Sequence, residues 1–154
     1  MFLSILIMIN YNEILNNNMK NVLIDILKNI EKNGLKDGNH LYITFQSNHR
    51  YVVMPKWLLK KYPEEITIVI QHEYYNFSVD KKNFKISLSF SNLKADLIID
   101  YNSIISFADP NSNFGIKLQN NETKNLNKKN ILKKQKVKKQ NPNNVIDFRN
   151  YKNN

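Results

Sequence analysis

The chain has 154 residues, of which 42% are hydrophobic, so it can form one apolar core rather than two. It contains no cysteine, which excludes disulfide frameworks, thiolate metal sites and cysteine nucleophiles, and which fits a reducing cytoplasm. The net charge of +10 is uneven: residues 1–118 carry 13 basic and 11 acidic residues (+2), whereas residues 119–154 carry 10 and 2 (+8). The basic character therefore belongs to the end of the chain.

The apolar start of the chain, residues 1–9, has the features of neither an export signal nor a membrane span. No basic residue precedes it and no small-residue cleavage site follows it. It is also shorter than the roughly 20 residues that a spanning helix needs. We interpret residues 1–10 as an N-terminal extension, which either lengthens the first helix or reflects an upstream start codon with Met8 as the true start.

Residues 11–33 are predicted to form an amphipathic helix. Apolar residues recur there at spacings of three and four, which places them on one face: Tyr11, Ile14, Leu15, Val22, Leu23, Ile26, Leu27 and Ile30. Gly34 is a suitable stop, because it adopts positive φ without a Cβ clash. The helix is rich in Asn, a weak helix former, so it must gain stability by packing on a sheet or on a second copy.

After Gly38 the pattern changes to alternation and short apolar runs, which predict about six strands. The predicted strands are residues 41–45, 66–71, 74–79, 84–90, 97–99 and 113–118. Pro55 opens a short predicted helix over residues 55–62, residues 102–107 are predicted as a helical turn, and residues 108–111 as a turn. One helix followed by short strands predicts an α+β fold: a small curled β-sandwich or open barrel with an N-terminal α-helix.

The composition changes again at Gln119. Residues 119–143 are dominated by Asn, Lys and Gln and contain no aromatic residue, so they bury too little apolar surface to offset their ordering entropy. We therefore predict a flexible linker over residues 120–143. Residues 144–154 restore apolar and aromatic side chains in the string NVIDFRNYK, a layout typical of a short docking peptide.

The polar residues form no recognisable catalytic or cofactor pattern. His40, His49 and His72 lie at no metal-ligand spacing, and no GxSxG elbow is present. Three glycines are too few for a phosphate-cradling loop. The carboxylate pair Glu64 and Glu65 is most simply a charge cluster at a turn. The sequence therefore predicts a protein that is not an enzyme and needs no metal or cofactor.

The Lys-rich segment leaves a nucleic-acid interpretation open. Seven lysines between Lys128 and Lys139 can neutralise phosphates. No aromatic residue is interleaved among them for base stacking, and no RNA-binding signature is present, so a solvated spacer is the simpler interpretation. The alternative function is an Sm-like RNA-binding protein that uses the barrel and the basic tail, and a dimeric scaffold with an unrelated client is a further alternative.

Four ordered segments resemble the stringent starvation protein B (SspB) family, in particular its alpha form. They are residues 40–45 (HLYITF), 54–79 (MPKWLLKKYPEEITIVIQHEYYNFSV), 84–92 (FKISLSFSN) and 105–119 (ISFADPNSNFGIKLQ). The family carries similar strings in the same order: YITF, IPxWL, YPEEMTIVLQHQ, an FSVTLSF-like strand and FADPSVNFGLQF. The resemblance covers roughly residues 11–119 and the end of the tail.

This resemblance implies a cytoplasmic homodimer that pairs through its N-terminal helix. Its Sm- or SH3-like domain, residues 11–119 here, would bind the ssrA degradation tag, the peptide added to stalled nascent chains, in a groove on each subunit. The tail would end in a peptide that docks on the N-terminal domain of the ClpX ATPase and so delivers tagged chains to the ClpXP protease.

The docking segment of the alpha form is similar to five residues of this chain: Val145, Ile146, Asp147, Phe148 and Arg149. Residues 150–154 depart from the family, which has basic residues there and ends sooner. The linker departs as well, because it is basic here, whereas family linkers are often acidic or rich in Pro and Ala. We therefore expect this linker to contribute its length and flexibility, rather than a particular sequence.

For the ssrA-peptide site the resemblance and the residue types together favour Gln71, His72, Tyr75, Phe107 and Phe114. Gln71 and His72 close a strand, where an amide can pair with the backbone or polar side chains of an extended peptide. The three aromatic residues would line apolar pockets for the tag. Two assignments stay open: Asp109 either contacts the tag or forms a turn, and Trp57, which we assign to the core, has the groove as its alternative.

Overall fold

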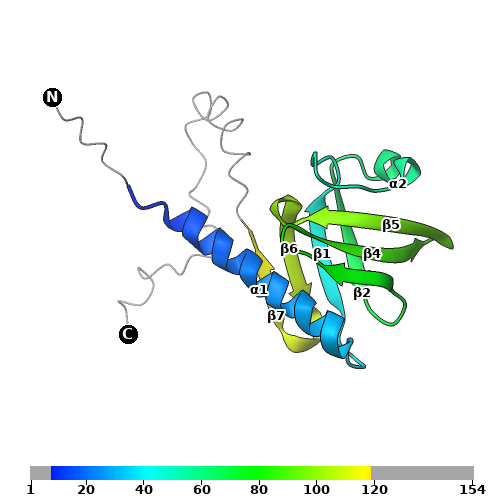
Figure 1. The fold of residues 1–154 in the computed structure, drawn as a ribbon, viewed down its shortest axis with the longest axis horizontal. Helices are drawn as coiled ribbons and strands as arrows, with labels where there is room; N and C mark the ends of the chain where they lie inside the picture. Colours follow the sequence, from blue (N-terminus) through cyan, green and yellow to red (C-terminus); the bar gives the residue numbers. More distant parts are fainter. Residues whose placement is uncertain (1–7, 119–154) are drawn as a thin grey trace, which may run out of the picture.

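The computed structural model describes residues 8–118, which fold into two antiparallel sheets and one long helix (Figure 1). The predicted extension up to residue 7, the linker and the docking segment lie outside the described residues. The elements are α1 (Tyr11–Asn33), β1 (Leu41–Gln46), α2 (Lys56–Lys61), β2 (Glu65–Ile70), β3 (Tyr75–Val79), β4 (Asn83–Phe90), β5 (Leu93–Asp100), the 3₁₀ turn Tyr101–Ser103, β6 (Ile104–Asp109), the 3₁₀ turn Pro110–Ser112 and β7 (Phe114–Lys117).

The two sheets form a small β-sandwich, as the sequence predicted. One sheet has four strands in the order β2-β1-β6-β7, and the other has three in the order β3-β4-β5. The strands alternate as their sequence pattern demands: in β1, Leu41, Ile43 and Phe45 are buried and the residues between them are not. The buried faces of both sheets meet in one core, whose largest members include Phe45, Phe84 and Phe107.

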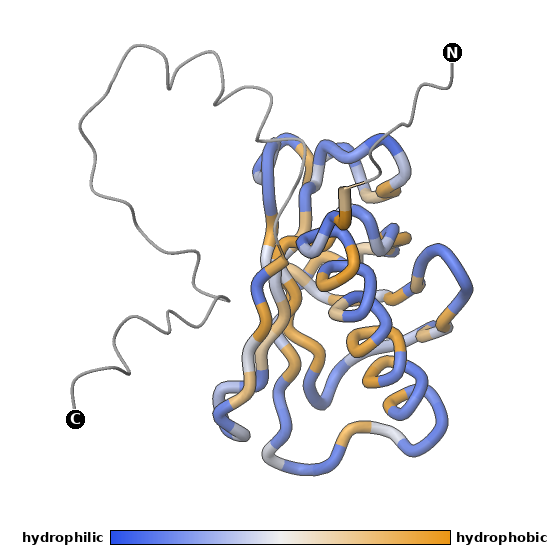
Figure 2. Tube along the Cα trace, turned by 90° about the vertical axis from the view of Figure 1, so that its left-hand side faces the viewer, coloured by the Kyte–Doolittle hydropathy of each residue, from blue (hydrophilic) through white to orange (hydrophobic). Residues whose placement is uncertain are grey.

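The helix α1 has the predicted bounds, and its apolar contacts with the core come from its second half. Leu23, Leu27 and Ile30 are buried in the core, and in the first half Asn16 is the buried residue. Figure 1 shows the C-terminal end of α1 beside the sheets and the N-terminal end pointing away from them. The apolar residues recur along the whole helix in Figure 2, so the first half carries an apolar face that the sandwich does not cover.

Capping residues fix both ends of α1. The Asn10 side chain accepts a hydrogen bond from the Glu13 N–H, which satisfies a donor of the first turn. Gly34, at φ 72°, ends the helix and donates its N–H to the Ile30 carbonyl at 2.8 Å. Glu31 also ties the helix to the sheet, because its carboxylate accepts the N–H of Val79 in β3 at 2.5 Å.

The prediction of a helical turn over residues 102–107 is wrong. The turn is a three-residue 3₁₀ helix that begins one residue earlier, at Tyr101, where the Asp100 side chain accepts the Asn102 N–H. From Ile104 onward the chain is the strand β6, held between β1 and β7. A strand with neighbours on both sides gains two ladders of hydrogen bonds, which outweighs the local turn signal.

Two further boundaries differ from the sequence prediction. The strand predicted at residues 97–99 runs from Leu93, because Ser91 and Asn92 adopt positive φ and close a two-residue hairpin with β4. The turn predicted at residues 108–111 falls later, on Pro110–Ser112, and β6 continues to Asp109. Residues 8–118 contain seven strands where the sequence indicated about six.

Candidate peptide-binding site

A cavity of about 450 Å³ opens where β2, the connection that follows it and the end of β4 come together. Aliphatic and aromatic side chains form one part of its wall, and the polar residues Gln71, His72 and Glu73 form another. The lining residues are Thr67, Ile68, Val69, Gln71, His72, Glu73, Leu88, Ser89 and Phe90. An apolar wall with a few convergent polar groups is the usual composition of a ligand site.

The β2 side of the cavity is the open edge of a sheet. β2 is the outermost strand and pairs with β1 alone among the described strands. The Ser47 N–H bonds to the Glu64 carbonyl, and hydrogen-bonded pairs alternate in an antiparallel ladder, so residues 64, 66, 68 and 70 turn their backbone groups toward β1. Thr67, Val69 and Gln71 therefore direct their N–H and C=O groups toward the cavity.

The β4 side of the cavity is a second open edge. β3 pairs with β4 only as far as Tyr75 opposite Ser87, so the last three residues of β4 pair with β5 alone. The pairing is interrupted by a bulge at Asn76, whose φ of 51° is left-handed. Asn tolerates this conformation better than most residues do. The Tyr101 N–H bonds to the Lys82 carbonyl, and the same alternation turns the backbone groups of Ser89 toward the cavity.

His72 meets His40 at the mouth of the site. The two imidazole rings lie edge to face with their centroids 6.1 Å apart. His40 comes directly before β1 and His72 follows β2, and the register pairs Leu41 with Ile70, so the sheet itself brings the rings together. We call this end of the four-stranded sheet, where His40 and His72 lie, the histidine end.

Of the five residues predicted for the tag site, Gln71 and His72 line the cavity and the other three do not. Tyr75 starts β3 just past the cavity and is 57% exposed. Phe114 starts β7, is 36% exposed, and lies over Phe107, with their ring centroids 6.1 Å apart. Phe107 is 1% exposed and belongs to the core, so it supports Phe114 from below rather than offering a surface of its own.

The strand register nevertheless places Phe114 at the same end of the sheet as the cavity. Tyr42 pairs with Ala108 and Asp109 pairs with Phe114, so the end of β6 and the start of β7 continue the row begun by His72 and His40. Strands lie about 4.8 Å apart, so β7 is about 14 Å from β2 across the sheet. An extended peptide covers that distance with about four residues.

Asp109 is the turn former of this row. Its carboxylate accepts hydrogen bonds from the Asn111 N–H at 3.1 Å and from the Asn39 side chain at 3.0 Å. The Asn111 side chain in turn donates to the Gly38 carbonyl at 2.6 Å. These bonds tie the loop before β1 to the turn after β6, which holds the histidine end in one shape. These hydrogen bonds account for the burial of Asp109 without a contact to the tag.

Gln71, His72 and Phe114 were accessible to sequence reasoning, whereas the β4 wall was not. Leu88 and Phe90 read as ordinary core positions in an alternating strand, and Leu88 is buried. Their role at the cavity depends on where β3 stops pairing, and only the bulge at Asn76 sets that point. Asn followed by the apolar residue Phe77 is a weak signal for such a bulge.

Within residues 8–118, no group of three His, Asp or Glu side chains is placed to hold a metal ion. No helix in the same part of the chain is long and apolar enough to cross a membrane.

The fold and the site define a small β-sandwich module with a cavity of about 450 Å³ between two strand edges. The model of the stringent starvation protein B family matches residues 13–152, and the chain belongs to this family. Membership supports an adaptor role of this family's type rather than an enzymatic one. No curated protein matches the chain.

Proposed function

We propose that this protein is a proteolysis adaptor that binds ssrA-tagged polypeptides and tethers them to the ClpX ATPase of the ClpXP protease. The observation that carries the proposal is the cavity between the open edges of β2 and β4, lined by Gln71 and His72. Family membership agrees with it, because the match runs through the folded domain and on to residue 152.

The grip on the tag rests on strand addition. An extended peptide laid in the cavity meets the free backbone groups of Thr67, Val69 and Ser89, which bond to any sequence. Specificity then comes from side chains: Phe90 takes apolar residues of the tag, and Gln71 and His72 take polar ones. The adaptor itself does not act chemically on the peptide, because the ATPase and its protease degrade the tagged chain.

The tag extends beyond the cavity along the histidine end. Past His72 and His40 it reaches Phe114, whose exposed ring offers an apolar contact three strands away. Tyr75 flanks the opposite side of the cavity. In this arrangement Phe107 acts by positioning Phe114, since the two rings are in contact and only the second is exposed.

The tail supplies the second contact. Residues 144–154, with Val145, Ile146, Asp147, Phe148 and Arg149, dock on the N-terminal domain of ClpX, and residues 120–143 act as the tether. These 24 residues would span roughly 25–30 Å as a flexible chain. Tethering makes the second binding step intramolecular, with an effective concentration of the order of mM. A weak contact between tag and ATPase then suffices.

A homodimer through α1 completes the proposal. Six apolar residues on and just before the first half of α1 are exposed: Met8, Ile9, Tyr11, Ile14, Leu15 and Val22. The helix buries Asn16, Leu23, Leu27 and Ile30 against the domain, so these exposed apolar residues lie on a neighbouring face of the same helix. A second copy that pairs its own α1 here would cover both faces by the same contacts.

Fluorescence anisotropy of a labelled ssrA-tag peptide tests the grip. We expect saturable binding at micromolar concentration or below, with one peptide per subunit, and a scrambled peptide as the control. Absence of binding would reject the adaptor function.

Deletion of residues 144–154 tests the tether. Tag binding should stay unchanged, while the faster degradation of a tagged substrate by ClpXP should be lost. Delivery that is unaffected by this deletion would refute the docking assignment without touching the tag site.

A further inference from the structure

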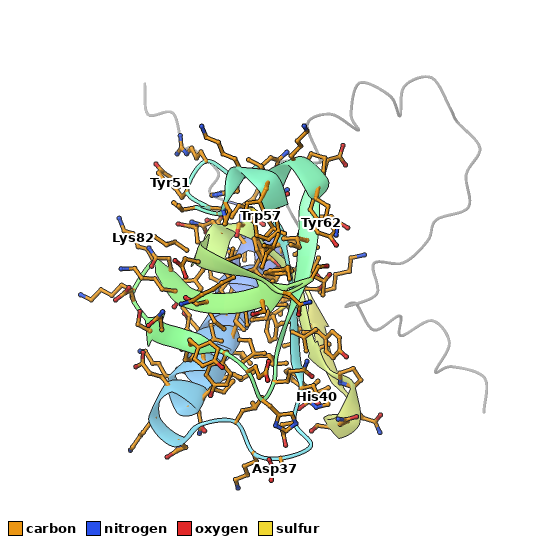
Figure 3. The ribbon with its side chains drawn as sticks, turned by 90° about the vertical axis from the view of Figure 1, so that its right-hand side faces the viewer. Asp37, His40, Tyr51, Trp57, Tyr62 and Lys82 are labelled. Carbon is orange, nitrogen blue, oxygen red and sulfur yellow. The ribbon has the colours of Figure 1, made fainter. Side chains whose placement is uncertain are left out.

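The opposite end of the four-stranded sheet carries a surface that the adaptor function does not use. β1 ends there and β2 begins there, and the connection between them, residues 47–64, contains α2. Figure 3 places Tyr51, Trp57 and Tyr62 at this end and His40 at the other. We call the exposed side chains of residues 50–62 the α2 surface.

Three aromatic rings are exposed on the α2 surface. Tyr51 is 56% exposed, Trp57 39% and Tyr62 36%. The assignment of Trp57 to the core is therefore wrong. Its neighbour Leu58 takes the core position and is fully buried, which turns Trp57 outward because adjacent helical residues point in different directions.

Cations accompany these rings. The Arg50 guanidinium lies 4.6 Å from the centroid of the Tyr51 ring, and the Lys61 ammonium lies 5.7 Å from that of Tyr62. Lys56 and Lys60 are exposed on α2, and Lys60 and Lys61 lie one helical turn beyond Trp57. Within residues 8–118 none of these four cations forms a salt bridge. Glu64 and Glu65 follow Pro63 and bound the surface on the β2 side.

We propose that the α2 surface binds single-stranded nucleic acid. Unpaired bases stack on exposed aromatic faces, and cations beside the rings pair with the phosphates that separate the bases. An acidic peptide would satisfy the cations and leave three rings without planar partners. A membrane surface would call for several inserted aliphatic side chains. Among residues 50–62, Val53 alone is a large aliphatic residue that is exposed.

The basic end of the chain strengthens this choice of partner. Residues 119–154 add a net charge of +8, from 10 basic and 2 acidic residues. That segment has no aromatic residue before Phe148, so it can contact phosphates but not stack bases until its last residues.

The chain contains one tryptophan, so the emission of Trp57 reports on the α2 surface alone. The full-length protein is titrated with an oligouridylate of about 20 nucleotides, and with the matching oligothymidylate to distinguish RNA from DNA. Saturable quenching by either strand is expected. Binding detected by anisotropy without quenching would place the nucleic acid on the tail and overturn the proposal. Quenching by anionic phospholipid vesicles or by an oligoglutamate, but not by the oligonucleotides, would also overturn it.

Variants then separate stacking from charge. Tyr51→Ala and Tyr62→Ala should each weaken oligonucleotide binding about tenfold. The double variant Lys60→Gln, Lys61→Gln should lower the slope of log affinity against log salt by about 1.4, because each phosphate contact on a single strand contributes about 0.7. Lys81→Gln, Lys82→Gln is the matched control, since these exposed lysines lie in the β3–β4 turn and carry the same charge (Figure 3 labels Lys82). A control that loses as much affinity as the test variant would refute the assignment.

Discussion

The two ends of the four-stranded sheet differ in what they offer to a partner. The histidine end presents unpaired backbone at Thr67, Val69 and Ser89 around a cavity, with no lysine or arginine in its lining. The end of the sheet with the α2 surface presents a short helix and exposed side chains, among them three aromatic rings and four cations. One end is suited to a polypeptide, whose main chain it can pair with, and the other to a polymer of flat bases and negative charges.

This difference arises from how the chain turns at each end. At the histidine end the chain leaves β2 for the other sheet and enters β3 through a bulge, which opens two strand edges. At the α2 end the chain makes a short helix between two paired strands, and the Tyr62 N–H bonds to the Leu58 carbonyl at its end. An open strand edge can pair with the backbone of a further strand. At the α2 surface, exposed side chains are the groups available for recognition.

The largest effect that we expect concerns neither end. Ile14→Asp places a charge in the exposed apolar face of α1 on both copies, so it should weaken the proposed homodimer about a hundredfold or more. Light scattering after size exclusion measures this shift toward the monomer. Lys28→Asp, on the polar side of the same helix, is the control. If the Ile14→Asp variant lost tag affinity per subunit together with its dimer, the tag site would need the partner copy. The comparison of the two ends within one subunit would then be incomplete.

The second effect tests the open edge of β2. Val69→Pro removes an N–H that faces the cavity and that β1 does not use, so the fold should persist while tag affinity falls about tenfold or more. Glu65→Pro is the matched control, because its N–H faces the same edge outside the cavity. Peptide anisotropy compares the two. Equal losses would mean that the tag pairs along the whole of β2 or that proline harms the sheet, and thermal unfolding distinguishes these outcomes.

The third effect tests how far the bound tag extends along the histidine end. Phe114→Ala removes an exposed ring three strands from β2 and should weaken tag binding about fivefold, or roughly 1 kcal/mol. The Trp57 emission titration with oligonucleotide should not change. A tag shortened by the residues that reach β7 should bind both proteins equally. If Phe114→Ala weakened the shortened tag as well, the ring would act on the cavity through the core.

The smallest effect concerns the shared core and leaves both ends alone. The Tyr101 hydroxyl donates to the Asp80 carbonyl at 2.8 Å. Burial, followed by the charges of Asp80 and Glu31, raises the pKa of Tyr101 to about 12. The folded state thus favours the neutral phenol, so this stabilisation is complete below pH 10 and is lost as the pH rises toward 12.

Tyr101→Phe should therefore lower the free energy of unfolding by about 1 kcal/mol at neutral pH and flatten its decline between pH 10 and 12. Urea unfolding at several pH values measures both changes. A variant that keeps the full alkaline decline would show that other tyrosines or lysines cause it.

Most of the fold could be predicted from the sequence because its local signals agree with its packing. The helix of residues 11–33 was predicted with its observed bounds, since apolar spacing and Gly34 both mark it. β4 was predicted within a residue, since Phe84, Ile86 and Leu88 face the core and Lys85 and Ser89 do not. β6 could not be predicted, because its strand state depends on two neighbours that are distant in sequence.

The site was less accessible than the fold. Gln71 and His72 could be named because they close a strong strand and resemble a family motif, and they line the cavity. Phe107 was named on its residue type, yet its burial follows from the register of β6 with β1. Trp57 was assigned to the core because Leu58 and Leu59 follow it. The orientation of the six-residue helix α2 determines which of these three side chains is exposed, and it exposes Trp57.

Hydrogen exchange of the full-length protein, with and without the ssrA-tag peptide, tests the central claim most directly. Strand addition predicts that the peptide slows exchange at the amides of Thr67, Val69 and Ser89, which lack a strand partner in the free domain. The amides of α2 should exchange as before. Slowed exchange confined to α2 or to residues 119–154, or no change anywhere, would contradict the account.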